Sequence, residues 1–290
     1  MGLRFTTYIG DGDSKAFPNV EQAQPYGPDK IPVKGECIGH VQKRVGTRLR
    51  NLKKTLGKKK LSDKRPIGGK NRLTKKWMNR LQSYYGMAIR QNTGSLNLMR
   101  KAVGAVLYHS SEAADSEARH RFCNEDSLWC KYRIAQKNGT KYVEKPGLPK
   151  AVRDEIMPVF QALSSTELLS KCLHGQTQNN NEGLNQLIWK RLPKSVYVGR
   201  HVLEMGVASA VLNSNNGTSR MMELLQRMGL TVGYFTRKFC SSKDNVRINS
   251  LKRKGSEKGL AYRKRKRAQR KGFEDNNAEK EGDVYGCGEF

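Results

Sequence analysis

Three carboxylates stand where they could bind divalent cations. Asp11 and Asp13 follow a short β-branched and aromatic segment, residues 4–10, and Glu182 follows a run of three asparagines. We expect the first two at the carboxyl edge of a strand and the third in the first turn of a helix. Phosphodiester cleavage with two metal ions needs carboxylates brought together from separate elements. Alternatively, Asp11 and Asp13 belong to a turn, and Glu182 interacts only with the helix dipole.

Eight cysteine and histidine side chains have the chemistry of zinc ligands. The densest group lies within 22 positions, in a segment with little other means of holding a structure: His109, His120, Cys123 and Cys130. Two close pairs lie elsewhere: Cys37 with His40, and Cys172 with His174. These pairs could meet if the first packs near the helix that carries Glu182. The alternatives are a loop with unrelated thiols and, for the pairs, cysteines that pack as small hydrophobic residues.

A basic amphipathic helix directly follows Cys37 and His40. Its apolar side chains recur at helical spacing and predict one buried stripe: Val41, Val45, Leu49, Leu52 and Leu56. Basic side chains occupy the remaining faces and could bind DNA phosphates: Lys43, Arg44, Arg48, Arg50, Lys53 and Lys54. This helix therefore combines a side for a protein core with a side for nucleic acid.

The composition favours nucleic acid as the partner. The 290 residues include 55 Lys and Arg against 26 Asp and Glu, a formal net charge of +29. Such a charge attracts polyanions, although it also fits a ribosomal or chromatin-associated protein. We expect no membrane segment, because no apolar run approaches about 18 residues. Six cysteines in a chain of this length indicate reduced intracellular thiols or metal ligands rather than a disulfide framework.

The periodicity predicts a mainly α protein. Short strands are expected near 4–10 and 31–37, and residues 110–148 are expected to be irregular. Helices are predicted over 41–56, after Thr74, and over 95–109, 149–163, 165–173, 179–191, 197–212 and 219–228. The last part of the chain is basic and then acidic, with almost no apolar content, which predicts disorder.

Three stretches resemble the Mutator-like transposase domain. They are Tyr8–Lys15, Glu36–Leu52 and Cys172–Arg191, and the similarity runs in order over roughly residues 1–240. The resemblance implies a ribonuclease-H-like core with a DDE catalytic triad, and a helical insertion before the final Glu. It also implies that Asp11, with Asp13 as the close alternative, is the second acid and Glu182 the third. Cys37 and His40 match the family's Cys-x-x-His motif.

The resemblance also implies a first catalytic Asp well upstream of the second. Only ten residues precede Asp11, and none is acidic. We therefore expect a C-terminal fragment of a transposase, a DNA-binding remnant that is inactive alone. Mg²⁺ or Mn²⁺ would bind Asp11 and Glu182 if the site were completed. Alternatives are a domesticated chromatin- or RNA-binding protein, and a structural zinc module for protein contacts.

The predicted organisation has four segments, α/β by descent. Residues 1–60 are a partial ribonuclease-H-like core, 61–173 a helical insertion, 174–245 the core helices with Glu182, and 246–290 a disordered tail. The basic run Arg263–Arg267 has the composition of a nuclear-localisation signal or a nucleic-acid patch, so we expect a nuclear protein. Nothing in the sequence opposes an oligomer.

Overall fold

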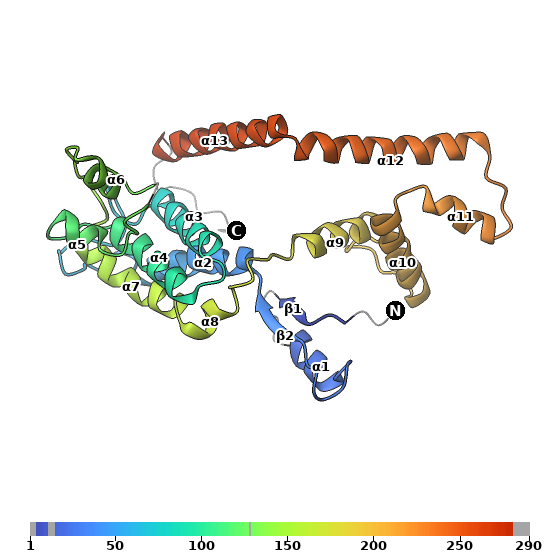
Figure 1. Cartoon of the computed structure of the whole chain (residues 1–290), viewed down its shortest axis with the longest axis horizontal. Helices are drawn as coiled ribbons and strands as arrows, with labels where there is room; N and C mark the ends of the chain where they lie inside the picture. Colours follow the sequence, from blue (N-terminus) through green and yellow to red (C-terminus); the bar gives the residue numbers. More distant parts are fainter. Residues whose placement is uncertain (1–3, 11–14, 128, 281–290) are drawn as a thin grey trace. The chain divides into compact units, whose positions relative to one another are not determined.

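The computed structural model describes residues 4–10, 15–127 and 129–280 (Figure 1). The chain divides into two compact units, residues 1–178 and 179–290. Helices dominate both, which confirms the mainly α prediction. Within the described ranges, no helix is long and apolar enough to cross a membrane.

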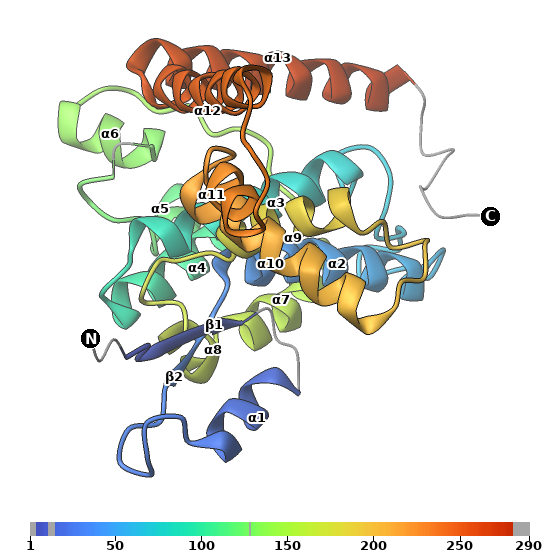
Figure 2. The ribbon, with the colours of Figure 1, turned by 90° about the vertical axis from the view of Figure 1, so that its right-hand side faces the viewer.

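The sheet of the first unit has two parallel strands, β1 (Thr7–Gly10) and β2 (Val33–Glu36). Helix α1 (Ala16–Ala23) lies between them in the chain (Figure 2). Pro18 stands in the first turn of α1, where a helix needs no amide donor. Two strands are the whole sheet of the described residues, so a ribonuclease-H-like core is not confirmed.

The remaining helices of the first unit form its core. Their bounds are α2 (Ile38–Leu56), α3 (Lys75–Gln91), α4 (Leu96–His109), α5 (Ser116–His120), α6 (Lys131–Asn138), α7 (Lys150–Leu163) and α8 (Thr166–Ser170). Helix α2 packs on α3 and α7, and α4 packs on α3 and α7. Val41, Val45 and Leu49 of α2 are fully buried, and Leu52 and Leu56 are partly buried against the same core. The predicted apolar stripe is therefore confirmed.

Two glycines let α2 and α3 approach closely. A Cβ added at Gly46 of α2 would lie 1.7 Å from the Gln82 side chain of α3, so that glutamine fills its place. The reciprocal contact joins Gly86 of α3 to Gln42 of α2, at 2.2 Å. Glycine inside a helix costs about 1 kcal/mol relative to alanine, and this packing accounts for its use at both positions.

The second unit consists of five helices in its described part. Their bounds are α9 (Asn179–Arg191), α10 (Arg200–Asn216), α11 (Arg220–Arg227), α12 (Tyr234–Gly255) and α13 (Glu257–Lys280). The buried apolar side chains of this unit are few: Leu192, Ala210, Val232 and Cys240.

The observed helices differ from the predicted disorder over residues 246–280, and residues 281–290 lie outside the described ranges. Lysine and arginine are good helix formers, so a composition too polar for a core still permits a helix. The unit boundary after Gln178 also differs from the predicted segments. Segments 1–60 and 61–173 lie together in the first unit, whereas almost all of 174–245 lies in the second.

Asp244 of α12 holds the start of α11. Its carboxylate accepts hydrogen bonds from the Ser219 hydroxyl (2.6 Å) and from the backbone amides of Thr218 (2.7 Å) and Ser219 (2.8 Å). These bonds, that of the Ser219 hydroxyl first, lower the pKa of Asp244 to about 2. Because the folded pKa is lower than the usual 3.8, the stabilisation is complete above about pH 4 and is lost as the pH falls toward 2.

We expect Asp244→Ala to destabilise the α11–α12 pairing by about 1 kcal/mol at neutral pH, as loss of a helix cap does. Hydrogen exchange of the α11 amides would measure the loss. The difference between the wild type and the variant should shrink between pH 4 and pH 2. Glu223→Gln, which removes an exposed carboxylate from α11 itself, is the control; an equal effect there would contradict this role of Asp244.

Candidate metal centre

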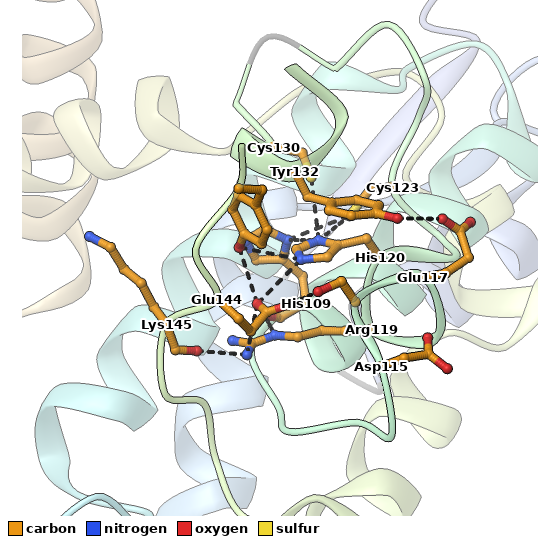
Figure 3. A network of polar contacts seen from close by, with 12 residues as sticks. His109, Asp115, Glu117, Arg119, His120, Cys123, Cys130, Tyr132, Glu144 and Lys145 are labelled. Carbon is orange, nitrogen blue, oxygen red and sulfur yellow. Dashed lines mark hydrogen bonds and ion pairs between the residues drawn. The ribbon is translucent and has the colours of Figure 1, made fainter. Parts of the chain in front are cut away.

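Four ligand side chains meet in the first unit. One potential ligand atom from each of His109, His120, Cys123 and Cys130 lies within 4.8 Å of the others. His109 ends α4, His120 ends α5, Cys123 follows in the next turn, and Cys130 directly precedes α6 (Figure 3). His120 and both cysteines are buried. The group predicted from residue type and spacing is thus assembled in space.

The distances match a tetrahedral site. The Nδ1 atoms of His109 and His120 are 3.0 Å apart, and the Cys123 sulfur lies 3.5 Å and 3.7 Å from them, respectively. The Cys130 sulfur lies 3.4 Å from Nδ1 of His120. Zinc at its usual bond lengths spaces tetrahedral ligands by about 3.3 Å for two nitrogens and about 3.6 Å for nitrogen and sulfur. These four ligand–ligand distances lie within about 0.3 Å of the tetrahedral values, so the group is compatible with Zn²⁺.

The far side of His120 is oriented by its neighbours. Its Nε2 faces Glu144 Oε1 and the Tyr142 hydroxyl, each at 3.5 Å, and its ring stacks on Tyr132 at 4.7 Å. Arg119 pairs with Glu144 at 3.0 Å (Figure 3). A carboxylate behind a ligating histidine fixes its tautomer and leaves the opposite nitrogen free for metal, the common arrangement at zinc sites. Nδ1, the atom that faces the other ligands, is therefore the nitrogen available to a metal ion.

Glu144 is suited to this role because it is ionised. Burial raises its pKa, but the Ser116 hydroxyl and the charge of Arg119 outweigh burial and hold the pKa below its usual value. Arg119 also donates to the carbonyls of His109 (3.0 Å) and Lys145 (2.7 Å). One guanidinium thus joins the end of α4, the helix α5 and the strand-like segment after α6.

Of the two thiols, that of Cys130 ionises more easily. A hydrogen bond between Cys123 and Cys130 lowers the pKa of Cys130 and raises that of Cys123, and both histidines further favour the Cys130 thiolate. Thiolate is the form that binds zinc. The loop is shaped locally by Ser127, whose hydroxyl accepts hydrogen bonds from the amides of Cys130 (3.1 Å) and Trp129 (3.4 Å).

The predicted pairs Cys37/His40 and Cys172/His174 are not part of the ligand group around His120. Among the described residues, the only group of three or more ligand side chains is the one around His120. Cys37 and Cys172 are buried, and burial raises the pKa of Cys172 to about 12. His174 uses Nδ1 to accept the Gln176 amide at 2.9 Å. Zinc binding by these two pairs therefore stays a prediction, and the Cys37 sulfur accepts a hydrogen bond from the Gln178 amide at 3.4 Å.

The Cys-x-x-His segment nevertheless contacts the end of β1. The amide of Cys37 donates to the carbonyl of Gly10 at 2.8 Å, and the Gln178 side chain donates to that of Ile9 at 2.7 Å. Asp11 and Asp13 follow directly but lie outside the described residues. Glu182 is exposed in the first turn of α9, in the second unit. The predicted approach of Asp11 to Glu182 therefore stays a prediction.

The basic face of α2 is mostly accessible. Lys43, Arg48, Arg50 and Lys54 are exposed, and Lys53 is partly exposed. Arg44 differs from this group, because its guanidinium donates to the buried Glu36 at 2.7 Å. This ion pair joins α2 to the end of β2, and the DNA contact of Arg44 stays a prediction.

Comparison with known families identifies the N-terminal part. A family model described as Mutator-like transposase matches residues 1–130. This part of the chain is similar to the Mutator-like transposase domain. The matched range includes β1, the Cys-x-x-His segment, the basic helix and all four residues of the metal centre. No curated protein and no solved structure matches the chain.

Several residues of the centre were missed in the sequence. Arg119, Tyr132, Tyr142 and Glu144 surround His120, yet they come from short or irregular segments without periodicity. The one available signal was the concentration of aromatic residues just after the last cysteine. It does not specify which ring contacts which ligand.

Proposed function

We propose that the chain is a DNA-binding protein related to Mutator-like transposases, with one zinc ion stabilising its first unit. The transposase domain over residues 1–130 carries the proposal. Transposases act on DNA, and a net charge of +29 suits that partner. The proposal includes divalent-metal chemistry at Asp11 and Glu182, with Mg²⁺ or Mn²⁺, as the family resemblance implies.

The exposed face of α2 is the proposed contact with the DNA backbone. Lys43, Arg48, Arg50 and Lys54 project from a helix whose opposite side is buried in the core. A rigid helix holds these charges at fixed spacing, so several phosphates can be bound without ordering a flexible segment. The exposed run Lys264–Arg267 of α13 supports a second basic contact and the proposed nuclear location.

The test replaces Lys43, Arg48, Arg50 and Lys54 by Gln. We expect the affinity for a labelled 20-base-pair duplex to fall at least about tenfold at about 0.1 M salt, because each lost phosphate contact removes a counterion-release contribution. Fluorescence anisotropy measures the affinity, and circular dichroism verifies that α2 remains folded.

A matched control removes four exposed lysines elsewhere in the same unit: Lys131, Lys141, Lys145 and Lys150. The control should retain most of the affinity. An equal loss in both variants would contradict a specific role for α2. Equal wild-type affinity for duplex RNA would favour a general basic nucleic-acid-binding protein instead.

A further inference from the structure

A cavity of about 570 Å³ opens beside the metal centre. It lies within the first unit, between α3, α4 and the loop before Cys130. Its lining includes aromatic and polar side chains: Tyr84, Lys101, Ser110, Phe122, Asn124 and Trp129. The volume falls in the usual range of small-ligand sites, about 300–1,000 Å³. We call it the Trp129 pocket.

The aromatic side chains of the Trp129 pocket remain accessible. Trp129 is 52% exposed and Tyr84 is 36% exposed, whereas large aromatic side chains are usually more buried. The ring of Trp129 packs edge-on against His109 of the metal centre, with centroids 5.0 Å apart. The metal ligand thus fixes the tryptophan that forms one wall.

One polar atom in the pocket wall indicates a missing partner. Ser110 is only 3% exposed, and its hydroxyl has no hydrogen-bond partner within the described residues. A buried hydroxyl without a partner costs free energy, so a ligand that hydrogen-bonds there would gain affinity. Asn124 adds an amide whose oxygen accepts the Asp126 backbone amide at 3.2 Å and whose NH₂ group can donate to the edge of a heterocycle.

The charges around the pocket suggest how a ligand enters. Lys101 of α4 lines the pocket and can bind a phosphate. Glu125 and Asp126 are exposed on the loop, and Asp126 pairs with Lys137 at 3.1 Å. A phosphate is therefore favoured on the α4 side, with the planar part of the ligand directed toward Trp129.

We propose that the Trp129 pocket binds a single unpaired nucleobase of DNA. A base combines a flat face that stacks on indole or phenol with an edge of donors and acceptors and a phosphate nearby. In a fully paired duplex neither face of the base is accessible, so the pocket selects a base that is out of the helix. The inference rests on the proposed function, because it takes DNA as the polymer that reaches the pocket.

The experiment compares two labelled duplexes of the same sequence, one fully paired and one with a single extra unpaired nucleotide. The zinc-loaded full chain should bind the second roughly tenfold more tightly, the usual size of one stacking contact. 2-Aminopurine at the unpaired position should lose fluorescence on binding. Trp129→Ala should bring the affinity ratio to about one, and Trp129→Phe should retain part of it.

Trp189→Ala is the control, because Trp189 is also 42% exposed but belongs to the second unit. It should keep the full preference, and zinc content would verify the fold of each Trp129 variant. If the wild type binds the two duplexes with equal affinity, the inference is overturned. The proposed function then still holds, provided that both duplexes bind at low salt. Failure to bind either duplex would overturn both.

Discussion

Chelation of zinc should unfold the segment between His109 and Leu148. In its described residues this segment contains only the short helices α5 and α6. The small buried cluster around it consists of Ala105 of α4, Cys123 and Cys130, with two partly buried rings. So small a cluster supplies little stability, whereas structural zinc in finger peptides contributes about 10–16 kcal/mol at neutral pH. We expect one zinc ion per chain. Its removal should change the tryptophan fluorescence and lower the melting temperature.

Cys130→Ser tests the same centre by substitution. We expect the zinc content to fall from one to near zero, and the melting temperature to drop by several degrees or more. Cys172→Ser is the matched control, because Cys172 is equally buried but lies outside the ligand group. It should keep its zinc even if it loses some stability. Equal zinc loss in the two variants, or a wild-type chain without zinc, would refute the proposed centre.

The affinity for duplex DNA should fall steeply with salt. A protein that contacts six to ten phosphates loses about 10³–10⁵ in affinity between about 50 and 200 mM salt, because bound cations return to the DNA. The net charge of +29 and the exposed basic residues of α2 make this many contacts attainable. Anisotropy titrations at several salt concentrations give the slope of log affinity against log salt.

The variant without Lys43, Arg48, Arg50 and Lys54 should have a slope smaller by about 3–4, since each contact contributes about 0.9. Arg44→Gln should hardly change the slope, because Arg44 is paired with Glu36, although it should lower stability. A slope near zero for the wild type would show that phosphate contacts do not drive the binding.

The helices of the first unit were predictable because the side chains that they bury recur at helical spacing in the sequence. Helices α2, α3, α4 and α7 each bury one periodic stripe, and their predicted bounds agree with the structure within a few residues. The ligands of the metal centre were also predictable, because four zinc-type side chains stood close together in the sequence. Their supporting residues were not, since contacts across irregular loops leave no period.

Other features of the structure could not be predicted from the sequence, for physical reasons. The spacing of Cys37 with His40 could not distinguish a ligand pair from a cysteine buried by packing. The charge pattern of α2 could not show that Glu36 takes Arg44 as its partner. For the end of the chain, the composition correctly indicated that no hydrophobic core forms. A helix rich in lysine and arginine can nevertheless form without a core.

The paired contacts of Gly46 with Gln82 and of Gly86 with Gln42 have a consequence for how such sequences diverge. A side chain that appears at either glycine must displace the glutamine opposite it, so a tolerated change at one position requires a shorter residue at the other. Positions 46 and 82 should therefore covary among related sequences, as should 42 and 86. The two pairs should vary independently of each other, because the side chains of each pair occupy a separate space between α2 and α3.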